Sequence, residues 1–440
     1  MSLIARHFRG GVHPQEGKEL SCSKPIQIAP LLSSYYVILH QHIGAPPKLL
    51  VKAGDDVKKG QVLAESGGFV SASVHAPTSG KVKLVEWPGP SGTKMKAVEI
   101  ISDGKDEWDA SIQHDPNWEQ HSGEEIKKRI ANAGIVGMGG AAFPTFVKLS
   151  PPLDKKIDTL ILNGAECEPF LTADHRLMLE NAEKVVTGAL LLAKALSVNK
   201  IYIGIENNKP DAIEKLKEIT NKNNIVVVPL RVRYPQGAEK QLIYAITGRE
   251  VSTGKLPMDV GCVVQNVGTA AAVMDAVVDL IPLIERVTTV TGGTVCNPSN
   301  WKFRIGTPLY KVLEFAGGIN MQPAKILLGG PMMGMAQSSL DVPIMKNTSG
   351  VLLLAKEEIA QYSSHPCIRC GRCADVCPML LMAGTLSLMI ESENFDLAEY
   401  TNVMDCIECG SCAYVCPALR PLVQHMKRGK AEVIANKQQK

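Results

Sequence analysis

The chain of 440 residues carries 47 Lys and Arg against 44 Asp and Glu, a formal net charge of +3. Its length suits about two to four domains, and its 45% hydrophobic and 21% charged residues exclude a wholly disordered chain. The small net charge and the 5% aromatic content argue against a nucleic-acid-binding protein.

The N-terminal sequence, MSLIARHFRGGVHPQEG, lacks the apolar core of a signal peptide, so export is not expected. No run of about 18 apolar residues occurs elsewhere in the sequence. We therefore expect a cytosolic chain, or one that reaches a membrane by docking onto other proteins.

The first hundred residues predict short strands separated by turns. The runs VKAGDDVKKGQVL (residues 51–63) and APTSGKV (residues 76–82) resemble the two halves of the barrel sandwich of biotinyl and lipoyl carrier domains. Carrier domains present a lysine on the hairpin between the halves, and residues 67–74 contain none. The resemblance therefore implies an unmodified carrier fold that serves for packing or docking.

From Gly123 to about Ile284, helical and strand patterns alternate. Strands are predicted at 158–163, 200–205 and 224–232, and helices at 124–133, 174–196, 209–220 and 238–247. Repeated strand–helix–strand units favour right-handed crossovers and a largely parallel sheet. A smaller unit follows at 286–334, and it resembles a ubiquitin-like β-grasp module of the soluble-ligand-binding type.

Two cysteine runs near the C-terminus are the strongest chemical signal. Cys367 to Pro378 and Cys406 to Pro417 both match the C-x₂-C-x₂-C-x₃-C-P spacing of bacterial ferredoxins. The two runs predict two [4Fe–4S] clusters. In this spacing the fourth cysteine of each run ligates the cluster of the other run. One would be held by Cys367, Cys370, Cys373 and Cys416, and the second by Cys406, Cys409, Cys412 and Cys377. Zinc sites do not use two complete quartets with a trailing proline.

The tail after Pro417 is basic. Such a tail is usually a solvated face, and docking onto a partner or an anionic surface is the alternative.

A glycine-rich stretch at residues 134–148 is the second signal. Glycines allow a backbone to approach a phosphate or a ring closely, and Lys148 supplies a cation. The run NGAECEP (residues 163–169) follows a predicted strand, where open α/β sheets bind ligands. A tight structural turn is the alternative interpretation of the glycines.

These two segments resemble motifs of the NADH-binding flavin subunit of respiratory NADH dehydrogenase. Two further segments, YPQGAE (residues 234–239) and VQNVGT (residues 264–269), resemble motifs of the same subunit. The resemblance implies that Gly137, Gly139, Gly140, Lys148, Asn163, Glu166 and Asn266 surround FMN. It implies that Phe143, Glu168 and Glu239, with Gly237 in the same motif, lie where the nicotinamide nucleotide stacks over the flavin. The chain departs from the family pattern at Met138, Ala142, Ala165 and Ala238.

The whole order of segments, from HFRGGVHP (residues 7–14) to the cysteine runs, closely resembles the C subunits of Rnf ferredoxin:NAD oxidoreductase complexes. This resemblance implies a multidomain α/β protein with four domains. These are a barrel sandwich at 1–115, a Rossmann-like FMN/NADH-binding domain at 116–284, a β-grasp module at 285–350 and a helical ferredoxin-type domain at 351–440.

The implied activity is electron exchange between ferredoxin and NAD(H) through FMN and two [4Fe–4S] clusters. The implied location is the cytoplasmic face of the membrane, where partner subunits, including a ferredoxin-like iron–sulfur subunit, translocate Na⁺ or H⁺. No catalytic acid–base residue is expected, because the cofactors carry the chemistry.

Three other functions remain open from the sequence. A cobalamin reductase uses a similar flavin domain and two clusters, but the N-terminal barrel argues against it. A soluble hydrogenase or dehydrogenase flavoprotein subunit would match the glycine-rich loop more closely. An electron-relay adaptor with a non-functional flavin site is kept open by Met138 and Ala165.

Overall fold

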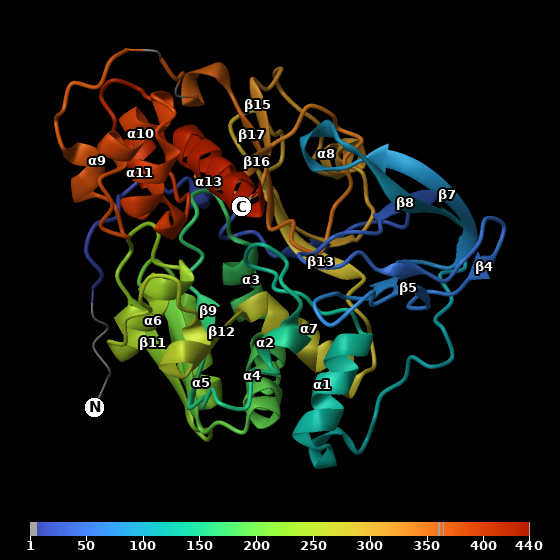
Figure 1. The fold of residues 1–440 in the computed structure, drawn as a ribbon. Helices are drawn as coiled ribbons and strands as arrows, with labels where there is room; N and C mark the ends of the chain where they lie inside the picture. Colours follow the sequence, from blue (N-terminus) through green and yellow to red (C-terminus); the bar gives the residue numbers. More distant parts are fainter. Residues whose placement is uncertain (1–6, 360, 364, 440) are drawn as a thin grey trace.

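The structure, a computed structural model, describes residues 7–359, 361–363 and 365–439. Figure 1 shows the N-terminal strands in blue on one side, the α/β domain in green and yellow below, and the C-terminal helices in red above it. A further sheet in gold and orange lies between them. The predicted mixed α/β architecture is therefore confirmed.

The N-terminal barrel consists of two small antiparallel sheets with strand orders β2-β8-β7-β4 and β3-β5-β6. Its strands are β2 (Ser34–Ile38), β3 (Lys48–Leu49), β4 (Asp56–Val57), β5 (Val62–Glu65), β6 (Val74–His75), β7 (Gly80–Pro88) and β8 (Lys94–Ser102). Val37, Leu63, Val82 and Val98 are fully buried between the sheets. Alternation along the strands directs these side chains inward.

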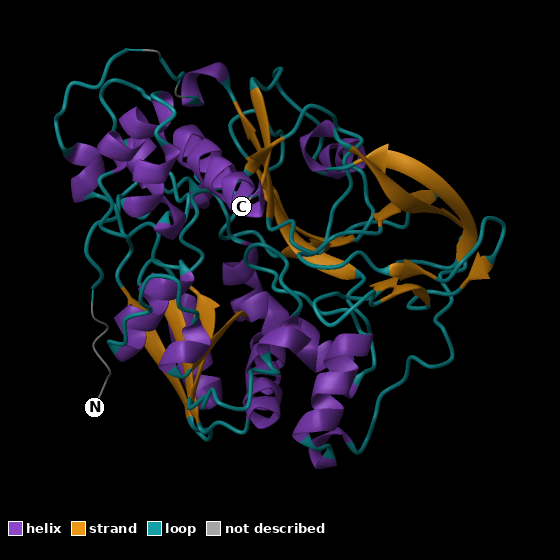
Figure 2. Cartoon of the chain, viewed as in Figure 1, coloured by secondary structure: helices purple, strands orange, loops and turns teal. Residues whose placement is uncertain are grey.

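The α/β domain is built on a parallel sheet of order β11-β10-β9-β12. Its strands are β9 (Thr159–Gly164), β10 (Lys200–Glu206), β11 (Ile225–Leu230) and β12 (Cys262–Asn266). Its helices are α1 (Gly123–Asn132), α2 (Thr145–Lys148), α3 (Ala173–Glu180), α4 (Ala182–Leu196), α5 (Pro210–Thr220), α6 (Glu239–Thr247) and α7 (Val267–Val278). Helices cover both faces of this sheet (Figure 2).

The single helix predicted at 174–196 is wrong. Asn181 leaves the helical region, with φ −128° and ψ 34°, and divides the segment into α3 and α4. Asparagine favours such breaks because its side chain competes for backbone hydrogen bonds.

The third unit is a six-stranded sheet of order β1-β14-β13-β17-β15-β16 with helix α8 (Leu309–Phe315) against it. Its strands are β1 (Ile26–Ile28), β13 (Glu285–Thr291), β14 (Ser299–Arg304), β15 (Lys325–Leu328), β16 (Met335–Ala336) and β17 (Gly350–Leu354). The edge strand β1 comes from the N-terminal segment and pairs in parallel with β14.

The cysteine runs lie in a helical unit with α9 (Arg372–Asp375), α10 (Ala383–Glu391), α11 (Phe395–Tyr400), α12 (Ser411–Tyr414) and α13 (Leu422–Gln439). Basic side chains of the tail pair with acids of this unit, as Arg428 does with Glu393 and Lys430 with Glu408, both at 2.6 Å. None of the described helices is both long enough and apolar enough to cross a bilayer.

Candidate redox site

The second cysteine run folds around a cavity lined by Cys377, Cys406, Cys409 and Cys412. These are the four cysteines that the spacing assigns to one cluster. Burial, followed by the charge of the neighbouring Cys409, raises the pKa of the Cys406 thiol to about 11. Iron binding would replace these protons, since thiolates are the ligands of iron–sulfur clusters. A buried cavity with four sulfur donors thus fits a [4Fe–4S] cluster.

The first run lies nearer the surface. A methyl group added at Gly384 would lie 3.1 Å from the Sγ of Cys373 and 4.0 Å from that of Cys367, so both sulfurs face the same glycine. Cys370 is exposed on this loop, and Cys416 is half-buried after α12. No three His, Cys, Asp or Glu side chains of the described residues converge on one point as the ligands of a single metal ion do. A cubane instead binds each thiolate to a different iron.

The glycine-rich loop connects α1 to α2 at the carboxyl edge of the parallel sheet. The amide of Gly137 donates to the carbonyl of Phe143 at 2.8 Å and closes the loop. Gly139 and Gly140 are exposed, and a methyl group at Gly140 would meet no atom within 4 Å. The loop therefore presents bare backbone to open space, which suits close approach by a phosphate or a ring.

Two predicted asparagines lie together beside this loop. Asn163 is the penultimate residue of β9, Asn266 is the last residue of β12, and the strand register pairs them. A methyl group at Gly139 would lie 2.9 Å from the Nδ2 of Asn266. The sheet edge and the glycine loop thus form one site, as the sequence predicts for this fold.

Lys148 and Glu239 also meet. The Nζ of Lys148 lies 2.7 Å from a carboxylate oxygen of Glu239 and 3.2 Å from the carbonyl of Val264. Both side chains are about one-third exposed, at 31% and 38%. Lys148 is therefore held by a partner and remains accessible to an anion.

The two predicted glutamates bind backbone of this chain. The Glu166 carboxylate accepts from the amides of Asp174 and His175 at the start of α3, at 2.7 and 3.3 Å. Glu168 accepts from the amides of Met332 and Met333 at 3.1 and 2.9 Å, and burial raises its pKa to about 7. The geometry gives Glu166 a capping role and lets Glu168 hold the loop at 329–334, so their contacts with FMN and nucleotide stay predictions.

Three buried cations behind the site were missed from the sequence. The Lys18 Nζ donates to the carbonyls of Glu166, Glu168 and Leu171 at 2.5–2.9 Å. The Arg286 guanidinium donates to the carbonyl of Met138 at 2.6 Å. The sequence around Lys18 and Arg286 contains no motif that would predict these contacts, because both residues lie far in sequence from the backbone that they bind.

The third cation is Lys346. Its Nζ joins the carbonyls of Ser73 in the barrel and Gly134 in the α/β domain, at 2.6 and 2.7 Å. Burial lowers its pKa to about 7. Lys346 therefore ties three units together beneath the loop.

The loop at residues 234–239 connects the flavin-type site to the second cysteine group. The Tyr234 hydroxyl donates to the carbonyl of Cys409 at 2.7 Å, and Gln241, in the helix α6 that follows the loop, donates its side-chain amide to the carbonyl of Pro378 at 3.1 Å. The amide of Gly237 donates to the Sγ of Cys167 at 3.2 Å. One loop therefore contacts both candidate cofactor sites.

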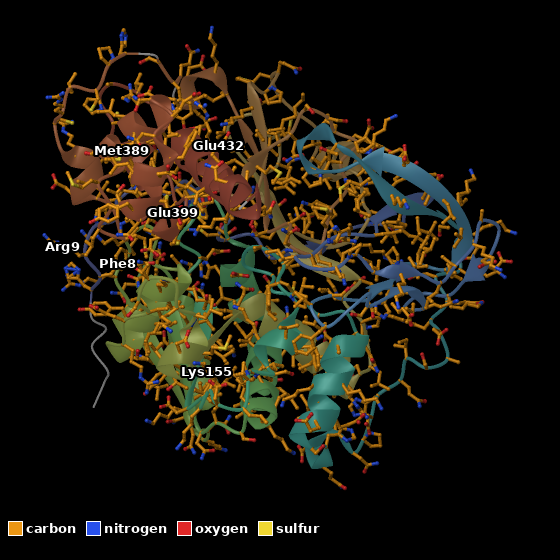
Figure 3. The ribbon with its side chains drawn as sticks, viewed as in Figure 1. Phe8, Arg9, Lys155, Met389, Glu399 and Glu432 are labelled. Carbon is orange, nitrogen blue, oxygen red and sulfur yellow. The ribbon has the colours of Figure 1, made fainter. Side chains whose placement is uncertain are left out.

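The N-terminal segment at residues 8–12 contacts both the helical cysteine unit and the α/β domain. The amide of Gly11 donates to the carbonyl of Val376, and Val12 forms a two-way backbone bridge with Tyr234, all at 2.8–2.9 Å. Figure 3 shows Phe8 and Arg9 of this segment between the helical unit and the α/β domain.

Comparison with family models gives four matches in chain order. Residues 6–105 match the RnfC barrel sandwich hybrid domain, and 130–275 match the Nuo51 FMN-binding domain. Residues 287–336 match the SLBB domain, and 360–417 match the 4Fe-4S dicluster domain.

The chain is 52% identical over 431 residues to the C subunit of the proton-translocating ferredoxin:NAD(+) oxidoreductase complex of Clostridium ljungdahlii, covering 98% of this chain and 94% of that protein. It is 48% identical over 432 residues to the C subunit of the Na(+)-translocating complex of Acetobacterium woodii, covering 98% of each. The chain belongs to this Rnf C-subunit family.

Membership in the Rnf C-subunit family confirms the predicted fold class and the predicted cofactor types, FMN and [4Fe–4S] clusters. It does not favour the cobalamin reductase or the relay adaptor. An NAD⁺-reducing [NiFe]-hydrogenase structure shares the fold, with a TM-score of 0.50 and 18% identity over 73% of this chain and 65% of that one.

Proposed function

We propose that this chain is the NAD(H)-reacting subunit of a ferredoxin:NAD⁺ oxidoreductase complex. It passes electrons between NAD(H), FMN and two [4Fe–4S] clusters. The observation that carries the proposal is the contact of the 234–239 loop with Cys409, because it joins the flavin-type site to a cluster site through one hydroxyl. A bound flavin supplies the exchange between hydride transfer and single-electron transfer.

The residues of the chain have positioning roles in this reaction. The open backbone at Gly139 and Gly140 would receive the flavin or its phosphate, and Lys148 would contribute the cation. Asn163 and Asn266, paired at the sheet edge, would border the flavin ring. No side chain has to move a proton at the reacting atoms.

The two clusters have different positions along the path. The site of Cys377, Cys406, Cys409 and Cys412 is buried beside Tyr234, and a cluster held there would be the first to exchange electrons with the flavin. Cys367, Cys370, Cys373 and Cys416 would hold the second cluster, and because Cys370 is exposed, that cluster would exchange electrons with a ferredoxin or another subunit.

We further propose that the chain is a peripheral subunit on the cytoplasmic face of the membrane, with domains at 1–115, 116–284, 285–350 and 351–440. Two similar relatives are named for different ions, protons in one and Na⁺ in the other. The choice of ion therefore belongs to the other subunits of the complex.

The test is an anaerobic cofactor count after reconstitution with iron, sulfide and FMN. We expect about eight irons, as two cubanes require, and one FMN whose absorbance NADH bleaches. A chain that holds the irons but neither retains FMN nor responds to NADH would contradict the proposal.

A further inference from the structure

An exposed aromatic ring lies on the hairpin that carrier domains use for their prosthetic group. Phe69 lies between β5 and β6, and its side chain is 61% exposed. The hairpin thus keeps the projecting position of a carrier but presents a phenyl ring in place of a lysine.

Phe69 contacts the α/β domain beside the glycine-rich loop. Its ring lies 5.7 Å from that of Phe146, centroid to centroid, at an interplanar angle of 71°. Phe146 belongs to α2, which begins directly after Phe143 and Pro144 of the loop. In Figure 1 the blue loop beside β5 extends toward α2. The barrel therefore contacts the α/β domain directly beside the glycine-rich loop.

The hairpin is held firmly in this position. The amide of Ala45 donates to the carbonyl of Val70 at 2.9 Å, and Ser71 Oγ bonds both the carbonyl of Ala45 and the amide of Gly67. Ala72 is buried in the core of the α/β domain. The ring of Phe69 is therefore presented on a fixed support.

The same support fixes the hairpin relative to the glycine loop. The Lys346 Nζ binds Ser73 and Gly134 at once, and a methyl group at Gly134 would lie 2.2 Å from the carbonyl of Ser73. The next residue, Asn347, donates to the carbonyl of Gly140 at 3.4 Å. Hairpin and loop are thus held as one structure.

We propose that Phe69 and Phe146 form an aromatic corner that stacks a flat ring of NAD(H). This inference rests on the proposed function, which brings a dinucleotide to the adjacent loop. Two phenyl rings meeting edge to face leave a ring face open to solvent, and planar heterocycles stack on such faces. The barrel sandwich then has a binding role in addition to packing.

The experiment measures equilibrium binding of NAD⁺ by calorimetry to the full chain with its cofactors. The variants are Phe69→Ala, Phe69→Tyr and the control Leu50→Ala, which removes another exposed apolar side chain of the same domain, 52% exposed. FMN content and the thermal midpoint are measured for each variant. Titrations with ADP-ribose and with nicotinamide mononucleotide identify which ring uses the corner.

We expect Phe69→Ala to raise the Kd for NAD⁺ at least about fivefold, the lower range for a base stacked on an aromatic side chain. Phe69→Tyr and Leu50→Ala should stay within about twofold of the wild type, and FMN content should not change. If wild type binds NAD⁺ and Phe69→Ala binds it equally well, the inference is overturned and the proposed function stands. If wild type binds no NAD⁺, both fail.

Discussion

At the scale of single residues, buried polar groups support the site from outside its motif. Lys18 supplies three donors to the backbone at 166–171, where Glu166 and Phe170 have φ of 47° and 68°. Such left-handed backbone is costly for residues other than glycine and persists only when its surroundings hold it. Lys18 therefore helps to hold this turn in its left-handed conformation.

Lys18→Met should lower the free energy of unfolding by about 2 kcal/mol or more, because three carbonyls lose their donor and stay buried. Lys24→Met is the matched control, since Lys24 donates to one partly exposed carbonyl, that of Pro298. Chemical denaturation of both variants measures the difference. Equal losses would show that Lys18 has no special role.

His75 predicts a pH dependence. Burial first, and then the charge of Lys346, lowers its pKa from 6.5 to about 3. Between these values the unfolded chain binds a proton that the folded chain does not. Stability from this group is therefore complete above pH 6.5 and declines as the pH falls, by up to about 1.4 kcal/mol per unit.

His75→Gln should therefore lose less stability than the wild type between pH 7 and pH 5. Denaturation midpoints at intermediate pH values measure the two slopes. Identical slopes would mean that the native His75 takes up its proton as readily as the unfolded chain.

At the scale of elements, the cysteine loops repeat one construction. Gly371 and Gly410 each directly precede a four-residue helix, with φ of 79° and 81°. Spacing alone predicts this repeat because three of the four ligands of each cluster lie close together in sequence. The division of 174–196 into two helices could not be predicted this way, because helical periodicity continues across Asn181.

Crossed ligation gives a prediction for these loops. Cys377→Ser should disturb the cluster of the second run, because Cys377 lines that cavity although it lies in the first run. Iron content should fall toward about four atoms per chain. The other cluster, held by Cys367, Cys370, Cys373 and Cys416, should keep its electron paramagnetic resonance signal. Cys296→Ser, at an exposed cysteine outside both runs, is the control. Loss of the exposed cluster's signal instead would contradict the assignment.

At the scale of the whole molecule, the N-terminal strap, residues 8–12, packs between the cluster unit and the α/β domain. A methyl group at Gly10 would lie 2.7 Å from the carbonyl of Cys377, and Gly10 has φ 83°. Gly104 has a similar φ of 75°, but nothing lies within 4 Å of its added methyl. Comparing substitutions at these two glycines therefore distinguishes the cost of left-handed backbone from the cost of a steric clash.

Gly10→Ala should therefore destabilise the chain by at least about 1 kcal/mol more than Gly104→Ala, since both carry the left-handed strain and one also carries a clash. Thermal unfolding with iron retention measures the difference. Equal losses of stability in the two variants would show that close packing of Gly10 against Cys377 does not stabilise the chain.

The order of the four units could be predicted from local patterns, but their junctions could not. The junctions depend on contacts made by Lys346, Arg286 and Phe69. Each of these residues contacts a residue at least 60 positions away in sequence, and a local sequence pattern cannot predict such contacts. The roles of Glu166 and Glu168 depend in the same way on what the fold brings to them.

The proposed function requires that electrons leave the flavin through the clusters. The most direct measurement is anaerobic reduction of cytochrome c by NADH, with wild type, Cys409→Ser and Cys296→Ser. All three should show flavin bleaching by NADH, while Cys409→Ser should reduce cytochrome c at least about tenfold more slowly, because the buried cluster beside Tyr234 is disrupted. Undiminished reduction by Cys409→Ser would contradict the path from flavin to cluster.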